Sequence, residues 1–398
     1  MSIVHLDQYF TTNEAIQQYV YHIVRGSDTI LEPSIGRGHL VASFVAQNAH
    51  YPIHGYDIDS TLLSDMVFEI DPHAQIMCRA DFLDIDDKRS YSTIIMNPPY
   101  YAQGSCKFIT KCFREHLADR GEMICVIPRT FLHATHSQQI LRDMMSQGRI
   151  TDIWFPNDEH LFAGATIDIV IFRYERAPIP SGDVLRSGTI CQFREGMTNP
   201  TSQTRICRYE GGNLQFIDTM RAGPVAHYQI RDMFDIYVGQ VSGADKIFAH
   251  DSGNIELLVR IPSVTRRFIC AIASLDELTP DARQHLQAHR AQLLERKIRA
   301  FSDDNWWQWG ALRNAQAVRE RYGEPCIYVT CRTRQTIVAV VGAVQWFNGS
   351  LLCMIPRNDE VDCAQVARYI NETLRAQYLS AGRFIITQRV LANSSFIS

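Results

Sequence analysis

The strongest constraint on the fold is an alternation of short apolar strands with helical segments over roughly the first 175 residues. The expected strands cover 29–31, 53–56, 75–78, 92–96, 122–127, 150–154 and 168–172. Helical periodicity fills most of the intervals, notably over 13–24, 39–46, 107–117 and 138–145. This alternation is typical of a mostly parallel sheet with helices on both faces. The sequence therefore predicts a doubly wound α/β domain with seven strands.

The pattern changes after a Pro-rich stretch at 177–180. Beyond it the chain consists of short β-like segments and turns rich in Gly, Ser, Pro and Asn, with one long charged helix expected over 281–301. A chain of 398 residues also suits more than one domain, at roughly 150 residues each. We therefore expect an α/β domain over 1–180 and a mixed α+β domain over 181–398.

The two expected domains differ in charge. Residues 1–180 hold 14 Lys and Arg against 22 Asp and Glu, a net charge of -8, whereas residues 181–398 hold 25 against 21, a net charge of +4. The second domain is therefore the better candidate for binding a polyanion. Its candidate contacts are Arg260, Arg266, Arg267, Arg332 and Arg334, for each of which a solvated surface position is the alternative.

Composition excludes several classes of protein. Hydrophobic residues make up 46% of the chain and charged residues 21%, which excludes a disordered or tail-like protein. No apolar run reaches the roughly 18 residues of a membrane-spanning helix, and the N-terminus does not resemble a signal peptide. The 11 cysteines form no CxxC pair, so neither a disulfide framework nor a Cys-rich zinc site is expected. We expect a protein without membrane contact that stays in a reducing cytoplasm.

The first expected strand runs into the turn 32–38 (EPSIGRG), which precedes a helix. Gly36 and Gly38 allow the backbone to approach a ligand closely, but the spacing is not G-x-G-x-x-G and no P-loop lysine follows. Glu32 at the start of so short a loop suits a cationic or amino-bearing ligand, and S-adenosylmethionine carries both an ammonium and a sulfonium. Taken alone, a tight strand-to-helix turn explains the segment equally well.

Two further strand ends add to this pattern. Asp57 ends the second strand about 20 residues after the glycine turn, where an acidic residue can accept hydrogen bonds from a ribose diol. Asp81 and Phe82 follow the third strand and offer a carboxylate beside a ring, which could hold an adenine. Each aspartate alone could be a cap or turn residue. Their placement after successive strands favours a ligand site.

The fourth strand runs directly into Asn97-Pro98-Pro99-Tyr100. The prolines fix an extended loop and remove two backbone donors, so the Pro98 carbonyl and the Asn97 amide oxygen can act as paired acceptors for an NH2 group. The exocyclic amine of adenine is a poor nucleophile because its lone pair is delocalised into the ring. Accepting both of its hydrogens favours a localised lone pair, which makes methyl transfer feasible. Tyr100 can stack on the base.

With these motifs in this order, residues 9 to 176 resemble the gamma-class DNA adenine-N6 methyltransferases of bacterial restriction-modification systems. In that class a short cofactor-contacting motif, similar to 9–14 (YFTTNE) here, precedes the cofactor loop, the NPPY motif and a target-recognition domain. The resemblance implies a Rossmann-like, seven-stranded S-adenosylmethionine-dependent methyltransferase fold. It also implies S-adenosyl-L-methionine as the cofactor, with no metal.

The resemblance assigns roles to individual residues. It places Asn97, Pro98 and Tyr100 at the target amine and Phe108 and Phe162 in the pocket of the target base, with a core position as the alternative for Phe162. The cofactor site that it implies comprises Thr11, Glu32, Pro33, Ser34, Gly36, Gly38, Asp57, Asp81 and Phe82. The chain departs from the family at 12–13, where Thr-Asn replaces the usual Thr-Pro or Pro-Pro.

The C-terminal likeness is looser and is limited to 238–246, 305–309 and 386–389. It implies a target-recognition domain that grips double-stranded DNA. The expected function is site-specific methylation of adenine N6, with the adenine flipped out of the duplex because a paired amine is inaccessible. The implied role of the bacterial or phage-encoded protein is protection of host DNA. A cognate restriction endonuclease that acts on the same site is a candidate partner.

Three other functions remain open at this point. A methyltransferase acting on a protein glutamine amide also uses NPPY, but such enzymes carry a small helical domain before the cofactor fold. An RNA adenine methyltransferase would need an RNA-binding module, and none is recognisable. A noncatalytic DNA-binding subunit would not need an intact NPPY motif, so replacing Asn97 with alanine distinguishes an enzyme from a binder.

Overall fold

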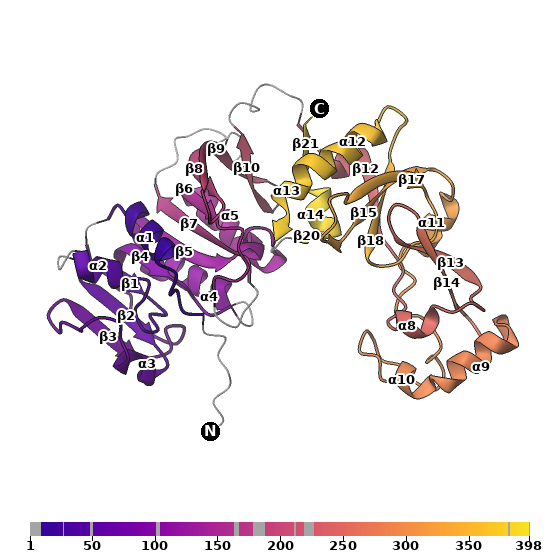
Figure 1. The fold of residues 1–398 in the computed structure, drawn as a ribbon, viewed down its shortest axis with the longest axis horizontal. Coiled ribbons are helices and arrows are strands. Elements are labelled where there is room, and N and C mark those ends of the chain that lie inside the picture. The colour runs from indigo at the N-terminus through magenta and orange to yellow at the C-terminus, as the bar shows by residue number, and fades with distance from the viewer. Residues whose placement is uncertain are drawn as a thin grey trace. The chain divides into compact units, whose positions relative to one another are not determined.

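The computed structural model describes residues 9–26, 28–47, 51–100, 104–162, 167–177, 188–210, 212–218, 227–380 and 383–397. The chain forms two compact units, Met1–Val225 and Ala226–Ser398, here called the first and second unit (Figure 1). Among the described residues, no helix has both the length and the apolar character needed to cross a membrane.

The first unit is built on a ten-stranded sheet with the order β10-β9-β8-β6-β7-β5-β4-β1-β2-β3. The pairs β1–β2, β2–β3, β1–β4 and β4–β5 are parallel, and β7 is antiparallel to both β5 and β6. The expected α/β class and the seven expected strands are confirmed. The strands are β1 (Ile30–Glu32), β2 (Ile53–Asp57), β3 (Gln75–Arg79), β4 (Tyr91–Met96), β5 (Leu117–Pro128), β6 (Gly148–Phe155), β7 (Ile169–Arg176), β8 (Thr189–Glu195), β9 (Thr201–Glu210) and β10 (Asn213–Asp218).

Helices cover both faces of this sheet (Figure 1). They are α1 (Glu14–Ile23), α2 (Ala42–Gln47), α3 (Ser60–Ser64), α4 (Gly104–Lys111) and α5 (Gln138–Gln147), and a π-helical turn over Cys112–His116 continues α4. Asn13 caps α1, its side chain accepting hydrogen bonds from the backbone N–H groups of Ala15 and Ile16. Asparagine is a favourable N-cap residue, so the departure from proline noted at position 13 is compatible with the start of α1.

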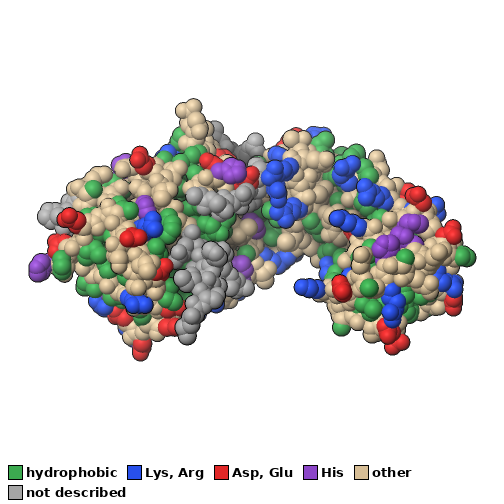
Figure 2. Space-filling view, turned by 60° about the horizontal axis from the view of Figure 1, so that its bottom comes forward, with side chains coloured by type: hydrophobic (Ala, Val, Ile, Leu, Met, Phe, Trp, Pro, Cys, Tyr) green, Lys and Arg blue, Asp and Glu red, His purple; other side chains and the backbone are tan. Residues whose placement is uncertain are grey.

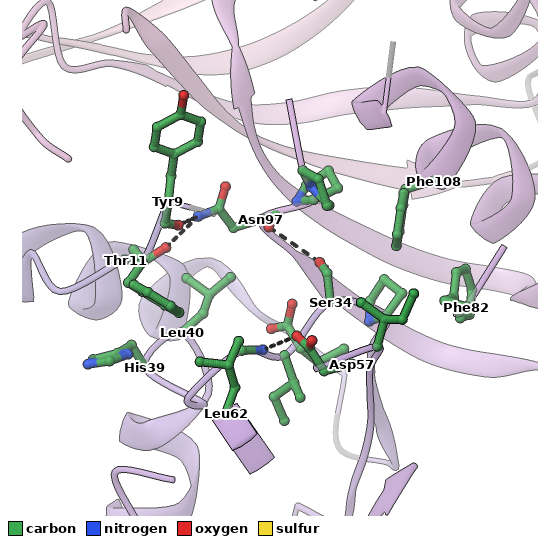
Figure 3. A pocket seen from close by; sticks show the side chains of 18 of the residues that line it. Tyr9, Thr11, Ser34, His39, Leu40, Asp57, Leu62, Phe82, Asn97 and Phe108 are labelled. Carbon is green, nitrogen blue, oxygen red and sulfur yellow. Dashed lines mark hydrogen bonds between the residues drawn. The ribbon is translucent and has the colours of Figure 1, made fainter. Parts of the chain in front are cut away.

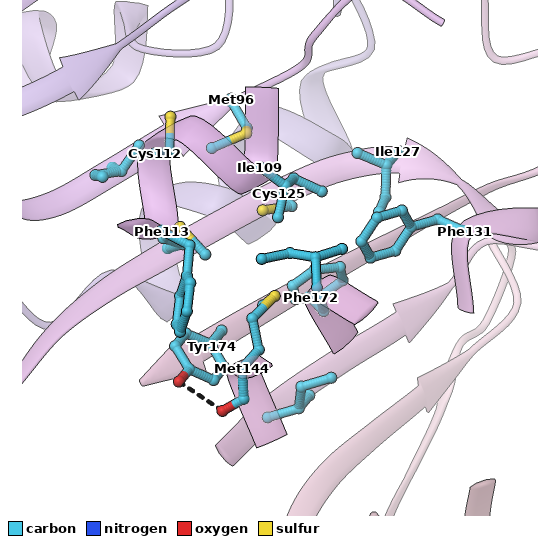
Figure 4. Close-up of a cluster of buried hydrophobic side chains, with 14 of the residues drawn as sticks. Met96, Ile109, Cys112, Phe113, Cys125, Ile127, Phe131, Met144, Phe172 and Tyr174 are labelled. Carbon is cyan, nitrogen blue, oxygen red and sulfur yellow. Dashed lines mark hydrogen bonds between the residues drawn. The ribbon is translucent and has the colours of Figure 1, made fainter. Parts of the chain in front are cut away.

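The central strand β5 shows why the sheet needs cover on both faces. Met123, Cys125 and Ile127 belong to the core formed with α4 and α5, part of which Figure 4 shows. The alternate residues Ile124 and Val126 belong to the core formed with α1 and α2. All five are fully buried. Burial on both faces is the reason that the sequence of this strand is continuously apolar rather than alternating.

The first unit extends further than the expected boundary at 180. β8 pairs in parallel with β6, matching Asp152 to Gln192, and β9 and β10 add two antiparallel strands outside it. The backbone hydrogen bonds of β6 therefore join residues 189–218 to the first sheet, and the boundary falls at 225/226. Residues 178–180 of the Pro-rich stretch lie outside the described residues.

The second unit is a mixed α+β structure, as expected. It contains a four-stranded sheet of order β12-β18-β15-β17, a three-stranded sheet of order β16-β20-β19, and the strand pairs β11–β21 and β13–β14. Its strands are β11 (His227–Gln229), β12 (Phe234–Val238), β13 (Ile255–Arg260), β14 (Val264–Phe268), β15 (Pro325–Thr330), β16 (Arg332–Thr333), β17 (Ala339–Ala343), β18 (Leu351–Pro356), β19 (Leu379–Ser380), β20 (Arg383–Ile385) and β21 (Ser395–Ile397).

The helices of the second unit are short. They are α7 (Ile230–Met233), α8 (Asp245–Phe248), α9 (Pro280–Ala288), α10 (Arg290–Leu294), α11 (Ala315–Glu320), α12 (Cys363–Tyr369), α13 (Arg375–Gln377) and α14 (Gln388–Ala392), with a π-helical turn over Ile370–Leu374 between α12 and α13. The prediction of one helix over 281–301 is wrong. The backbone breaks at His289, and beyond α10 the Arg296 guanidinium donates to the carbonyls of Ser242, Trp306 and Gln308, which fixes a loop where a helix was expected.

Candidate active site

A pocket lies at the carboxyl ends of β1, β2, β3 and β4 (Figure 3). This is the edge at which open α/β sheets bind ligands. Of the residues expected to form a site, the pocket brings together Thr11, Glu32, Pro33, Ser34, Gly36, Asp57, Asp81, Phe82, Asn97, Pro98 and Phe108. Three other expected residues, Gly38, Tyr100 and Phe162, do not line it.

The glycine turn after β1 depends on left-handed backbone conformations, with φ +54° at Gly36 and +77° at Gly38. The Gly36 N–H donates to Oδ2 of Asp57 at 2.9 Å, which ties the turn to the end of β2. A Cβ at Gly38 would lie 2.5 Å from the terminal methyl of Met66 and 2.6 Å from the ring of Phe68. Gly38 is therefore required for packing beneath the turn rather than for contact with a ligand.

Asp57 is partly buried at the end of β2 and has one hydrogen bond on each oxygen. Oδ2 accepts from the Gly36 N–H and Oδ1 accepts from the Asp59 N–H at 2.9 Å. Burial raises the pKa of Asp57, and these backbone donors oppose that rise. Each oxygen keeps a further lone pair. Asp57 can therefore accept hydrogen bonds from two adjacent hydroxyl groups.

Glu32 is the least satisfied acid in the pocket. Its side chain is 2% exposed, and among the described residues Oε2 has no hydrogen-bond partner. Burial raises the pKa of Glu32 well above its usual range; the backbone N–H of Asn97 opposes this rise and the nearby Asp57 adds to it. A buried carboxylate without a partner is costly, and a cation relieves that cost. The pocket therefore fits a ligand with a positive charge beside Glu32.

Asn97 follows β4 and is held from both ends of its amide. Its Nδ2 donates to the backbone carbonyl of Tyr9 at 2.7 Å and to Oγ1 of Thr11 at 2.9 Å (Figure 3). The Tyr100 hydroxyl donates to Oδ1 of Asn97 at 2.6 Å. Burial raises the pKa of Tyr100 well above its usual range, so the phenol keeps its proton and remains a donor. Tyr100 thus supports Asn97 from outside the pocket.

Aromatic rings lie on two sides of Asn97. The Tyr9 ring stacks on Tyr100 at a centroid distance of 5.1 Å and contacts the Phe162 ring at 5.8 Å. Phe162 is 3% exposed and belongs to the core beside α1, the core placement that the sequence left open. Phe108 lines the pocket and stacks on Phe82 at 5.7 Å with an interplanar angle of 22°.

Nine residues of the lining were not assigned individually from the sequence. Tyr9 and Phe10 belong to the expected cofactor-contacting segment 9–14 and Pro99 to the NPPY motif, and the others are Ile35, His39, Leu40, Ile58, Leu62 and Ala80. Ile58 follows Asp57 directly and is 53% exposed, which is unusual for an isoleucine. Burial and the charge of Arg37 lower the pKa of His39, whose Nδ1 is buried with no partner among the described residues. The position of both residues directly after an expected site residue is the signal that could have identified them.

The ten-stranded sheet, with helices on both faces and a pocket at its carboxyl edge, defines an α/β fold. No family model matches the chain. In sequence it is similar to the type II methyltransferase M.HindII of Haemophilus influenzae, with 23% identity over 83% of this chain and 75% of that protein. It is also similar to the type II methyltransferase M.HincII of Haemophilus influenzae, with 24% identity over 43% of this chain and 37% of that protein.

A solved structure of the type IIL restriction-modification enzyme MmeI in complex with DNA resembles this chain with a TM-score of 0.58. The likeness covers 96% of this chain and 63% of that one, at 10% identity. The similarity therefore extends in fold through both units, although the sequences have diverged almost completely.

Proposed function

We propose that this chain is a site-specific DNA methyltransferase that uses S-adenosyl-L-methionine to methylate N6 of adenine. Its relatives M.HindII and M.HincII are named as type II methyltransferases, and MmeI was solved with DNA. The observation that carries the adenine assignment is the Asn97 amide, whose NH2 group is occupied by Tyr9 and Thr11, so that only its oxygen is left for a substrate. An oxygen acceptor beside a carbonyl-rich proline loop suits an amine.

The residues of the pocket fit the cofactor. Glu32 would face one of its positive charges, Asp57 would accept from the ribose hydroxyls, and Asp81 and Phe82 would border the adenine. Pro33, Ser34 and Gly36 form the turn that allows close backbone approach. When bound, S-adenosylmethionine supplies an activated methyl group on its sulfonium.

Asn97 and Pro98 would prepare the amine for transfer. Oδ1 of Asn97 has two lone pairs, one of which receives the Tyr100 hydroxyl, and the other can accept one amine hydrogen. The Pro98 carbonyl would accept the second. Holding both hydrogens favours a localised lone pair on nitrogen, which forms the new N–C bond as the methyl–sulfur bond breaks. The amine then releases one proton to solvent, so no strongly basic side chain is required.

The target adenine has to leave the duplex to reach Asn97. Stacking on Tyr100 is the proposed fit for the flipped base, with Phe108 and Phe162 as further aromatic neighbours. Because the Tyr9 ring now stacks on Tyr100 and also contacts Phe162, that ring has to turn aside when the base enters.

We assign DNA recognition to the second unit. Residues 226–398 hold 20 Lys and Arg and 17 Asp and Glu, a net charge of +3, whereas residues 1–225 hold 19 and 26, a net charge of -7. Figure 2 shows basic side chains spread over the visible surface of the second unit. Four of the candidate arginines are exposed and, in the described part of the chain, make no ion pair, so their guanidinium groups are available to phosphates: Arg260, Arg266, Arg267 and Arg332.

The biological role that fits this activity is the protection of a DNA site in the cytoplasm from a cognate restriction endonuclease.

The deciding experiment is single-molecule sequencing of DNA from a methylation-free bacterial host that expresses the protein. We expect one sequence motif to be modified at a single adenine, and we expect Asn97→Ala to abolish the modification, a loss of at least about 100-fold in rate, because it removes the acceptor for the amine. Glu69→Ala, an exposed position outside the pocket, is the matched control for expression and should leave the pattern unchanged.

Other outcomes point elsewhere. Modification of cytosine alone would contradict the adenine assignment but keep a DNA methyltransferase. Folded protein that binds S-adenosylmethionine and modifies no DNA would overturn the proposal, and tritium transfer to RNA or to protein glutamine would then separate the two alternatives.

A further inference from the structure

The side-chain amide of Asn97 ends in two atoms with opposite hydrogen-bonding character, and only the oxygen can accept a hydrogen bond from an amine substrate. The amide carries an acceptor oxygen and a donor NH2 group on the same planar end. If the NH2 group faced the substrate, two donors would meet and the amine would be repelled. An amine substrate therefore requires contacts that keep the amide oxygen of Asn97 pointing toward the substrate, and these contacts have to come from other residues.

Three neighbours of Asn97 make contacts that orient its amide. The Tyr9 backbone carbonyl can only accept, so the atom 2.7 Å from it is the nitrogen. The second N–H of the same group meets Oγ1 of Thr11 at 2.9 Å, so both amide hydrogens are used on one side. On the other side the Tyr100 hydroxyl donates to Oδ1 at 2.6 Å. The three contacts agree on one orientation of the amide.

Thr11 is itself held rigidly. Its side chain is 4% exposed, and its backbone carbonyl accepts a hydrogen bond from Nε2 of Gln17 at 2.7 Å. Gln17 lies in α1, whose first turn is capped by Asn13. A residue of α1 thus holds the backbone of Thr11, and burial confines its side chain, which gives the Asn97 amide a stable partner.

We propose that Thr11 is a positioning residue that acts through Asn97, rather than a residue whose hydroxyl binds the cofactor. This inference rests on the proposed function, since the orientation of the amide matters only if an amine is the substrate. It corrects the cofactor role that the sequence resemblance implies for the Thr11 side chain, although the residue still lines the pocket. The reaction would slow without Thr11 because the amide could turn about its last torsion and leave a buried N–H unpaired.

The test compares Thr11→Val, which keeps the shape and removes the oxygen, with Thr11→Ser, which keeps the oxygen. Thr201→Val is the matched control, because Thr201 is an exposed threonine of β9 that does not line the pocket. For Thr11→Val we expect the single-turnover rate at saturating cofactor and DNA to fall by about 3- to 10-fold, the loss of one neutral hydrogen bond. The dissociation constant for S-adenosylmethionine should stay within about 2-fold of the wild-type value because no cofactor contact is lost. Thr11→Ser should restore the rate, and Thr201→Val should not change it.

A second measurement is independent of activity. In protein labelled with nitrogen-15 at asparagine, the side-chain NH2 signals of Asn97 are identified by their loss in Asn97→Ala. Removing the Thr11 oxygen should shift the signal of one of the two hydrogens and speed its exchange with solvent, whereas Thr11→Ser and Thr201→Val should leave both signals in place.

The outcomes separate the two proposals. Weaker cofactor binding with a normal saturated rate and unmoved Asn97 signals would assign the hydroxyl to the cofactor and overturn the inference. Unchanged rate, affinity and signals would overturn it as well. If the wild-type protein methylates no DNA, the proposed function fails, but the Asn97 signals still decide whether Thr11 holds the amide.

Discussion

Two glutamates of the same sheet, Glu32 and Glu122, are almost equally buried, at 2% and 3% exposure. They differ in what surrounds the carboxylate. Glu122 accepts from the Gly26 N–H at 2.7 Å, from Thr93 Oγ1 at 3.2 Å and from Nε of Arg173 at 2.5 Å. Glu32 keeps one oxygen without a hydrogen-bond partner among the described residues.

This difference separates a carboxylate that stabilises the fold from one that is poised for a ligand. Glu122 lies inside β5 and bonds across to β4, β7 and the segment after α1, so the protein itself completes its shell. Glu32 lies at the carboxyl end of β1, facing the pocket. A buried polar group with an incomplete shell needs an explanation, and a cationic ligand supplies one. The same substitution at both positions therefore tests the contrast.

The largest expected effect is on folding. Glu122→Gln should lower the free energy of unfolding by about 3–5 kcal/mol, because the buried guanidinium of Arg173 would lose the nearer of its two carboxylate partners and keep only the longer contact with Glu175. Glu32→Gln should change it by less than about 1 kcal/mol, since an uncharged amide replaces a carboxylate that burial already disfavours. Denaturant titration followed by circular dichroism measures both values. Equal losses of stability at the two positions would contradict the assignment of Glu122 to the fold and Glu32 to a ligand.

The next effect is on ligand affinity. Glu32→Gln should weaken S-adenosylmethionine by about 30-fold, or about 2 kcal/mol, because a buried charge partner is lost. Binding of 5′-methylthioadenosine, which carries neither the ammonium nor the sulfonium, should change by less than about 2-fold. Calorimetric titration with the two ligands gives the comparison. A similar loss for both would place Glu32 beside the nucleoside instead of a positive charge.

The smallest expected effect is a pH dependence that belongs to Glu32. Because its pKa is raised in the folded protein and a bound cation would lower it, cofactor binding should release a proton. The dissociation constant should therefore fall as the pH rises from about 5, by at most about 10-fold per pH unit. Calorimetry in buffers with different ionisation enthalpies measures the protons released, and Glu32→Gln should reduce the number. A wild-type constant that is flat with pH would contradict the raised pKa.

The stability of the ligand-free protein should show the opposite trend. The folded state keeps a proton on Glu32 over a pH range in which the unfolded chain, with a glutamate pKa of about 4.3, has lost it. This group therefore stabilises the fold below that range, and its contribution is lost as the pH rises through the folded-state pKa. Glu32→Gln serves here as the control that removes the trend.

Most strands of the expected domain are predictable because their residues are buried on both faces and form apolar runs; the exception is the edge strand β3, where Ile76 is 52% exposed. The sequence does not identify β8, β9 and β10 as part of that sheet. β9 shows why: its residues Thr201 to Thr204 are exposed, so the strand carries little apolar signal. The second unit is harder still to predict, because its short elements owe their limits to side chains such as Arg296, which binds carbonyls distant in sequence.

Much of the candidate site is also predictable, since the ends of neighbouring parallel strands meet at one edge of a sheet. From strand order alone, that rule places Glu32, Asp57 and Asn97 close together. It does not indicate that Gly38 serves packing, or that Tyr100 supports Asn97 from outside the pocket. Those roles depend on side-chain directions, which strand order does not specify.

Local periodicity and strand order are both properties of the sequence, and they are enough to specify the α/β architecture and the edge at which the polar residues gather. Which of the polar groups are satisfied is a property of the folded chain alone. Thr11 and Asn97 are 86 residues apart and meet at 2.9 Å, while Glu32 is left with an oxygen that no described residue pairs. Hydrogen bonding between distant segments depends on distances of a few tenths of an ångström, and packing alone sets those distances.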